Sequence, residues 1–303
     1  MDGTLEWPVE HGGAAVLTAG GERFSYRPGS GEDRRYPVAS VTKLLSSLAV
    51  LAAVDDGLLG LDDEVDQQPA AERGGERSAA DHGRPPEAPA GVTVRHLLAH
   101  ASGLPFEPGQ GSQRPPGERR IYSNLGFQVL AEVLETATGK PFDAWLDERV
   151  LGPLAMTSTA LEVHGGGAWA GAAAGAVSTL PDLALLAGCL LDGGTGVVSP
   201  GLVAEAATVQ YPGLAGLVPG VGRYDPCDWG LGFELKDGKA RHWMGDARSA
   251  ASFGHFGASG CFVWVDPKAG VAAAAVTDRP FGDGGWGLAT WPAWSDEIAA
   301  VGA

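Results

Sequence analysis

A serine and a lysine stand three residues apart, Ser40 and Lys43, where a long apolar stretch begins. Residues three apart share one face of a helix, so the Lys43 amine can reach the Ser40 hydroxyl. A serine hydroxyl is a weak nucleophile unless a base takes its proton, and a lysine in an apolar helix tends to lose its charge and become such a base. Alternatively, Ser40 caps the helix and Lys43 extends along the surface. The pair alone leaves both interpretations open.

A tyrosine and an asparagine stand close together in a second segment, Tyr122-Ser123-Asn124, just before a helical pattern. The Tyr122 phenol can pass a proton if neighbouring cations lower its pKa. The Asn124 amide can orient a substrate carbonyl or the Lys43 amine. The alternative is structural, with Ser123 or Asn124 capping the helix while Tyr122 packs.

A third segment, residues 255–261, reads His-Phe-Gly-Ala-Ser-Gly-Cys ahead of a strand-like run. A backbone N–H in such an extended segment can donate to an oxyanion, and Gly257 leaves room for close approach. The alternative is a glycine-rich turn with His255 at the surface. Ser259 nearly completes a nucleophile elbow, but Cys261 replaces the final glycine of that motif. We therefore do not expect Ser259 to be a nucleophile.

Two further histidines, His96 and His100, are four residues apart and can share a helix face. No glutamate accompanies them in the metalloprotease pattern, and Ser102-Gly103 ends the helix at once. We expect no metal there.

The elements that must bring these segments together are strands near both ends of the chain and helices between them. A hairpin is predicted over residues 14–18 and 23–26, followed by a buried helix over 41–55. A second hairpin is predicted over residues 261–265 and 271–277, with a turn at 266–270. Further helices are predicted over residues 94–99, 125–136, 142–150, 180–191, 202–208 and 293–301.

This order predicts an α+β fold, with one antiparallel sheet built from both termini and flanked by helices, and a mainly helical second domain. We expect residues 1–39 and 210–303 to form the discontinuous sheet domain and residues 40–209 the helical domain. Residues 67–91, rich in Pro, Gly and charge, predict a flexible insertion, and residues 108–117 a second loop of the same kind.

The amino-acid composition argues against some classes of binding partner. The 303 residues carry 21 Lys and Arg against 37 Asp and Glu, a net charge of −16. So acidic a surface repels phosphate backbones and anionic lipid, which argues against nucleic acid and membranes as partners. The first residues lack the basic start and apolar core of a signal peptide, and three cysteines without metal-ligand spacing suit a reducing compartment. We expect a cytoplasmic protein.

Taken in order, the three segments resemble the serine β-lactamase and penicillin-binding-protein superfamily, whose Ser-x-x-Lys motif matches residues 40–43. The class C β-lactamase-like branch, with its esterases, D-amino-acid peptidases and DD-peptidases, is the most similar group. The resemblance runs from about residue 14 to the C-terminus. Its blocks are residues 39–43, 94–105, 116–124, 139–142, 151–157, 177–179, 230–233, 254–257, 266–267 and 277–279.

The resemblance implies a β-lactamase/transpeptidase-like fold with the active site between the sheet and the helical domain. It implies Ser40 as the acyl-enzyme nucleophile, with Lys43 and Tyr122 as the proton-transfer pair. Asn124 would contact a substrate amide, and the N–H groups of Ser40 and Ala258 would form the oxyanion hole.

His255 departs from the family pattern, because β-lactamases and transpeptidases usually have the lysine of Lys-Thr-Gly at that position. Histidine is mostly neutral at pH 7, and Phe256 removes the hydroxyl that follows, so recognition of a substrate carboxylate is weakened. We therefore expect a carboxylesterase acting on a small-molecule ester, without cofactor or metal. The alternatives are an amide hydrolase of the same fold (β-lactamase, DD-peptidase or D-aminopeptidase) and a catalytically silent binding protein.

Overall fold

The computed structural model of the chain describes residues 7–18, 21–26, 34–65, 88–107, 114–162 and 167–299. Most of the predicted insertion, residues 67–87, and most of the second predicted loop, residues 108–113, lie outside these ranges.

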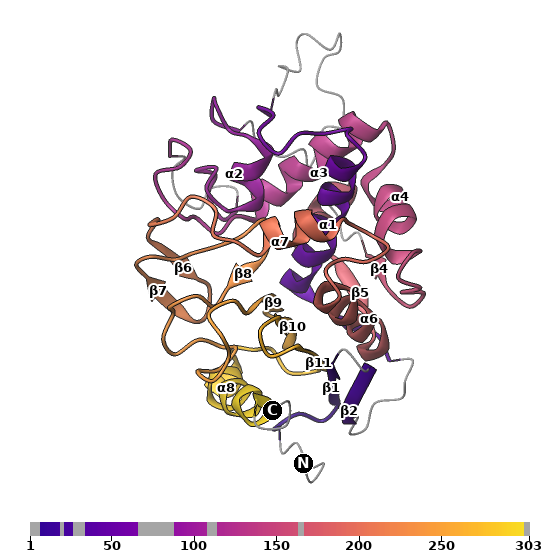
Figure 1. Ribbon diagram of the computed structural model, residues 1–303, viewed down its shortest axis with the longest axis vertical. Coiled ribbons are helices and arrows are strands. Elements are labelled where there is room, and N and C mark those ends of the chain that lie inside the picture. The colour runs from indigo at the N-terminus through magenta and orange to yellow at the C-terminus, as the bar shows by residue number, and fades with distance from the viewer. Residues whose placement is uncertain are drawn as a thin grey trace.

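A six-stranded antiparallel sheet lies at the centre of the lower half of the molecule (Figure 1). Its strand order is β2-β1-β11-β10-β9-β8, so strands from near the two ends of the chain pair with each other. The predicted sheet built from both termini is confirmed. The bounds are β1 Gly12–Thr18, β2 Gly21–Tyr26, β8 Glu234–Leu235, β9 Phe253–Gly257, β10 Cys261–Asp266 and β11 Val271–Thr277.

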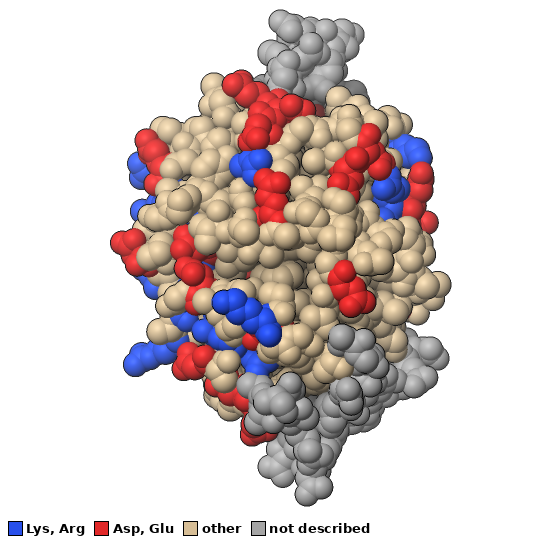
Figure 2. All heavy atoms as spheres, viewed as in Figure 1, with Lys and Arg blue, Asp and Glu red and all other residues tan. Residues whose placement is uncertain are grey.

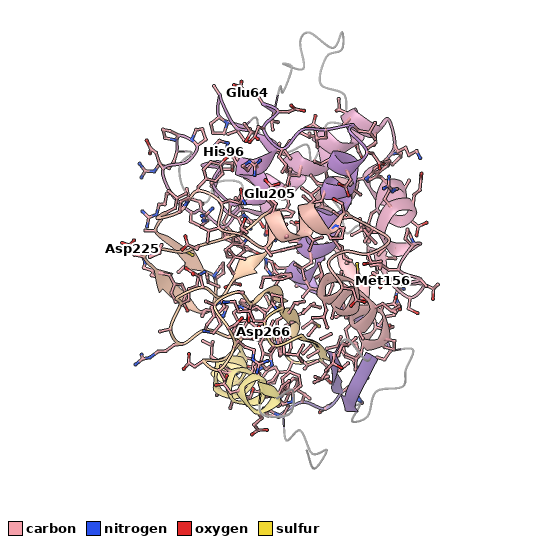
Figure 3. All side chains as sticks on the ribbon, in the orientation of Figure 1. Glu64, His96, Met156, Glu205, Asp225 and Asp266 are labelled. Carbon is pink, nitrogen blue, oxygen red and sulfur yellow. The ribbon has the colours of Figure 1, made fainter. Side chains whose placement is uncertain are left out.

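Both faces of this sheet are covered, as the alternation along β10 shows. Val263 and Val265 belong to the apolar core shared with the helical part, whereas Phe262 and Trp264 belong to a separate aromatic core. Successive side chains of a strand point to opposite faces, so β10 contributes to two cores at once. Asp266, at the end of β10, is labelled in Figure 3. Its carboxylate accepts hydrogen bonds from the backbone N–H groups of Lys268 and Ala269, in the predicted turn to β11.

One helix packs on each face of the sheet. α6 (Leu180–Leu191) packs on β1, β10 and β11, and its bounds match the prediction. α8 (Trp286–Ala299) covers the aromatic core on the other face. The prediction for α8 began seven residues too late, because Pro292 lies within the helix and proline normally disfavours a helix interior.

The mainly helical part is centred on α1 (Thr42–Asp55), whose side chains are buried over almost its whole length. α1 follows a short 3-10 turn, η1 (Ala39–Val41), and its N-cap is Val41 without a side-chain capping bond. The alternative that Ser40 caps this helix is therefore wrong. The other helices here are α2 Val94–Leu98, α3 Asn124–Thr138, α4 Phe142–Leu146 with the short π-helix η3 Asp147–Leu151, α5 Gly167–Ala174 and α7 Pro200–Ala206.

Several short elements were not predicted, because two or three residues of strand carry no readable alternation. β3 (Tyr36–Pro37), β5 (Ala176–Ser178) and β4 (Ala160–Leu161) form a small sheet beside η1. β6 (Gly216–Val218) and β7 (Gly222–Tyr224) form a hairpin.

The surface carries its acidic side chains scattered over the face shown in Figure 2 rather than in one patch. Within the described residues, no helix combines the length and the apolar character that crossing a bilayer requires.

Candidate active site

Ser40 lies in η1, held between the sheet and α1. The preceding residue, Ala39, adopts a left-handed backbone with φ of 45°, which is uncommon for a residue with a side chain. Strand β9 packs directly against this turn, and a Cβ added to Gly257 would lie 2.1 Å from the carbonyl oxygen of Val38. Gly257 is thus needed for the close approach of β9 to the Ser40 turn.

Lys43 lies in the first turn of α1 and is fully buried. Its Nζ is 3.5 Å from Ser40 Oγ and donates to Asn124 Oδ1 at 2.6 Å and to the Ala173 carbonyl at 2.8 Å. Burial lowers the pKa of Lys43 to about 7, although the Glu107 carboxylate works in the opposite direction. The alternative of a surface lysine is therefore wrong, and burial makes the neutral form of Lys43 accessible near neutral pH.

The two protein acceptors decide where the neutral amine points its lone pair. A neutral amine has two N–H groups, and Asn124 Oδ1 and the Ala173 carbonyl accept both. The lone pair is then left for the Ser40 hydroxyl. This arrangement can remove the Ser40 proton.

Tyr122 reaches the same point from the segment before α3. Its buried hydroxyl hydrogen-bonds to Ser40, and Lys43 Nζ lies 4.7 Å from the centre of its ring. Burial raises the pKa of Tyr122 well above its ordinary value, and the contact with Ser40 only partly offsets this. The condition that neighbouring cations lower this pKa is not met, so Tyr122 holds its proton at neutral pH and can act only by relaying it.

His255, on β9, completes the polar centre. It is 2% exposed, so the alternative of a surface histidine in a turn is wrong. Nδ1 donates to the Phe256 carbonyl at 2.7 Å, which leaves Nε2 as an acceptor 3.5 Å from the Tyr122 hydroxyl. Burial, with the nearby Lys43, lowers the pKa of His255 to about 4. His255 is therefore uncharged at neutral pH.

Asn124, the first residue of α3, uses its side chain within the protein. Oδ1 accepts from Lys43, and Nδ2 donates to Glu107 Oε1 at 2.6 Å. The helix cap is Ser123, whose Oγ accepts from the Gly126 N–H at 3.0 Å. Of the two roles considered for Asn124, the observed geometry supports the one in which it orients the Lys43 amine. To contact a substrate amide, the Asn124 side chain would have to give up one of these two hydrogen bonds.

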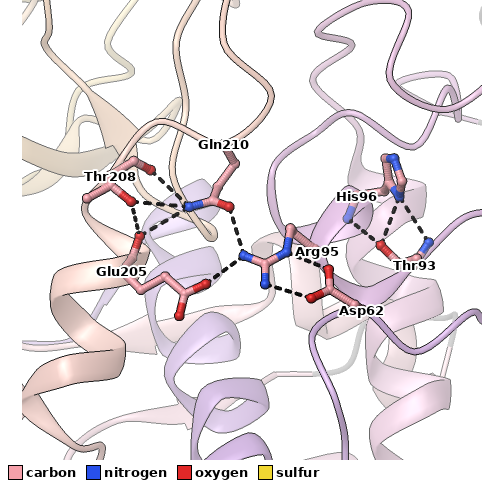
Figure 4. A network of polar contacts seen from close by, with 7 residues as sticks. All are labelled: Asp62, Thr93, Arg95, His96, Glu205, Thr208 and Gln210. Carbon is pink, nitrogen blue, oxygen red and sulfur yellow. Dashed lines mark hydrogen bonds and ion pairs between the residues drawn. The ribbon is translucent and has the colours of Figure 1, made fainter.

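His96 and His100 lie in different surroundings. His96 Nδ1 accepts from the backbone N–H of Thr93 in a capping box at the start of α2, beside the network in which Arg95 bridges Asp62 and Glu205 (Figure 4). His100 instead faces the site. Its ring lies 4.6 Å from the Tyr122 ring, centre to centre.

A pocket of about 100 Å³, open to solvent, lies above Ser40 and is lined by Tyr122, His255 and Ala258. The remainder of its wall is mostly apolar, and comprises Phe106, Val218, Pro219, Trp229 and Phe256 together with Glu234.

Glu234 was not found from the sequence, nor was Glu107, because neither lies in a recognisable motif. Glu234 is wholly buried on β8 and accepts from His242 at 2.8 Å and from Trp243 at 3.0 Å. Burial raises the pKa of Glu234, but His242 and Lys239 outweigh burial and hold it below its usual range. The pocket wall thus contains a negative charge.

Comparison with known proteins identifies the fold and the family. A protein-family model described as Beta-lactamase matches residues 7–290. The chain belongs to the beta-lactamase family. The β-lactamase/transpeptidase-like fold is thereby confirmed, as a solved structure of a beta-lactamase (Mb2281c) from Mycobacterium bovis also shows. It superposes with a TM-score of 0.83 at 43% identity, and the match covers 98% of this chain and 96% of that one.

Proteins named for other activities are also similar to this chain. D-alanyl-D-alanine-carboxypeptidase/endopeptidase AmpH of Escherichia coli is 31% identical over 180 residues, covering 49% of this chain and 44% of AmpH. The chain therefore spans less than half of that relative. The structure of EstCE1, described as a hydrolase with promiscuous acyltransferase activity, matches with a TM-score of 0.69 at 18% identity, covering 93% of each chain. At that identity the likeness shows the fold alone.

Proposed function

We propose that this family member is a carboxylesterase that works through an acyl-enzyme on Ser40. The observation that carries the proposal is the buried Lys43 amine, which lies 3.5 Å from Ser40 Oγ and has a pKa of about 7. When this amine is neutral, its two N–H groups are already bound by Asn124 Oδ1 and the Ala173 carbonyl. Such an amine is a base matched to neutral pH.

In the proposed reaction, neutral Lys43 takes the Ser40 proton as Oγ attacks the ester carbonyl. The backbone N–H groups of Ser40 and Ala258, both at the pocket, stabilise the oxyanion. The proton then returns through the Tyr122 hydroxyl to the leaving alcohol. Water, activated by the same groups, releases the acid and restores Ser40.

The charge of the pocket supports an uncharged ester over a substrate with a carboxylate. His255 is neutral, Glu234 is negative, and the described lining residues include no Lys or Arg. A substrate carboxylate would meet no fixed cation, whereas an apolar acyl group would meet aromatic and aliphatic side chains.

The test compares hydrolysis of p-nitrophenyl butyrate by the wild type and by Ser40→Ala. We expect the substitution to lower kcat/KM by more than about 10³-fold with an unchanged melting temperature. Ser259→Ala is the matched control, since it removes the hydroxyl of the residue that follows Ala258 and is expected to retain activity. Equal turnover by the wild type and Ser40→Ala would remove Ser40 from the mechanism.

An amide hydrolase of the same fold is the second candidate, favoured by the similarity to AmpH, a carboxypeptidase/endopeptidase, and to the beta-lactamase from Mycobacterium bovis. Nitrocefin separates the two, since it carries both a β-lactam amide and a carboxylate. A higher kcat/KM for nitrocefin than for p-nitrophenyl butyrate would favour this second candidate. A silent binding protein would leave Ser40 unlabelled by a fluorophosphonate probe.

A further inference from the structure

The Glu107 carboxylate lies at the far end of a hydrogen-bonded chain that leads to the proposed base. Glu107 Oε1 accepts from Asn124 Nδ2 at 2.6 Å, and Asn124 Oδ1 accepts from Lys43 Nζ at 2.6 Å. The Asn124 backbone N–H also donates to the Phe106 carbonyl at 3.0 Å, so the start of α3 and the segment that carries Glu107 are joined at two points.

The orientation of the Asn124 amide decides whether Lys43 can act as a base. With Oδ1 towards Lys43, the amide accepts an N–H and leaves the amine lone pair for Ser40. With the amide reversed, Nδ2 would donate to that lone pair, and Ser40 would lose its base. A carboxylate can only accept when ionised, so Glu107 bonds Nδ2 and excludes the reversed amide.

We propose that Glu107 is a positioning residue for acylation, one that fixes the Asn124 amide so that the Lys43 lone pair faces Ser40 and that places a negative charge beside this amine. The inference rests on the proposed function. It concerns a residue outside the three motifs.

The other titratable groups around Lys43 do not place a second negative charge beside its amine. His100 after α2, Tyr122 before α3 and His255 on β9 are all buried, and burial favours their uncharged forms at neutral pH. Glu234 on β8 is bound by His242 and Trp243. Among the described residues, Glu107 is the carboxylate that raises the pKa of Lys43, against the effect of burial.

Two substitutions separate orientation from charge. In Glu107→Gln the side-chain oxygen still accepts from Asn124 Nδ2, but the charge is lost. In Glu107→Ala both are lost. Glu118→Gln is the matched control, because it removes one negative charge from an exposed side chain four residues before Tyr122.

The measurement is the second-order rate of Ser40 labelling by a fluorophosphonate as a function of pH, which needs no natural substrate. For Glu107→Gln we expect the acid limb to move to lower pH by about half a unit or more, with a plateau close to that of the wild type. For Glu107→Ala we expect the same shift and a plateau lower by about tenfold. Glu118→Gln is expected to follow the wild type.

The outcomes distinguish the two proposals. A wild type that is not labelled overturns the proposed function. A labelled wild type whose acid limb is unchanged in both Glu107 variants overturns the role of Glu107. Equal plateaus in Glu107→Gln and Glu107→Ala overturn the orientation part. Circular dichroism and melting curves of each variant show that the comparison is made on folded protein.

Discussion

His100 holds the backbone on both sides of Tyr122. The His100 carbonyl accepts from the Ile121 N–H at 2.9 Å, and its ring Nδ1 accepts from the Ser123 N–H at 3.1 Å. His100 itself has a left-handed backbone with φ of 54°, which histidine and asparagine tolerate better than most residues. The phenol of Tyr122 is thus aimed at Ser40 by a clamp from the end of α2.

The first prediction follows from that clamp. His100→Ala leaves the buried Ser123 N–H without its acceptor and removes the imidazole ring that packs against Tyr122. We therefore expect kcat for p-nitrophenyl butyrate to fall about tenfold or more, with little change in KM. An unsatisfied buried donor costs about 1–3 kcal/mol of stability. His96→Ala, which loses a helix cap away from the site, is the control and is expected to lower stability without lowering kcat. Equal kcat losses in both variants would contradict the clamp.

The pH dependence of kcat/KM is the second prediction. Lys43 must be neutral to take the Ser40 proton, and its pKa is about 7, so we expect activity to be lost as pH falls through about 7. The pKa of Tyr122 is raised and that of His255 is about 4, so neither titrates between pH 5 and pH 9. A profile measured from pH 5 to pH 9 should show a single acid limb and then a plateau. A second limb near pH 6.5 that disappears in His255→Asn would contradict the neutral His255.

The third prediction concerns stability, and its sign follows from the depressed pKa of Lys43. Between pH 7 and about 10.5 the unfolded chain keeps the Lys43 proton and the folded protein does not, so this residue makes folding more favourable as pH rises through that window. We expect the free energy of unfolding of the wild type to rise relative to Lys43→Met by about 3 kcal/mol from pH 7 to pH 10, at 1.36 kcal/mol per pKa unit. Urea denaturation of both proteins at several pH values measures the difference. Ser40→Ala, which keeps Lys43, should follow the wild type, and a flat difference would mean that Lys43 is charged in the folded protein at pH 10.

The fourth prediction uses the close approach of β9 to the Ser40 turn. In Gly257→Ala the new methyl group would lie 2.1 Å from the Val38 carbonyl oxygen, so one of the two backbones must move. We expect a loss of about 1–3 kcal/mol of stability and a fall in kcat/KM of at least tenfold. Gly201→Ala is the control, because nothing lies within 4 Å of its added methyl group in α7, and we expect its activity and melting temperature to be retained. Wild-type activity in Gly257→Ala would show that the approach is not needed.

The sequence was most informative where a repeating pattern or a familiar motif was present. α6 was predicted at its observed bounds, because a run of Leu and Ala follows the capping Thr179, and α3 was predicted to within two residues, because Gly139 ends it in a left-handed conformation. Ser40, Lys43 and Tyr122 were singled out from residue type and spacing, and their catalytic roles remain predictions.

What the sequence did not reveal depends on tertiary contacts. Glu107 lies in a loop without periodicity, and its bond to Asn124 spans 17 positions. Glu234 lies on a two-residue strand and becomes important only because the fold buries it beside His242. His100 was weighed as a metal ligand, whereas the fold turns its ring towards Tyr122 instead. The raised pKa of Tyr122 follows from burial, which residue type alone does not give.

The junction of η1 with β9 has a consequence for how the protein could be monitored. Ser40 comes from an early segment and Ala258, which lines the same pocket, comes from a late one, so the proposed esterase turnover depends on the docking of two distant stretches of polypeptide. Catalysis should therefore vanish under mild denaturant while the helices still give their far-ultraviolet signal, which would make hydrolysis a sensitive reporter of the earliest loosening of this molecule.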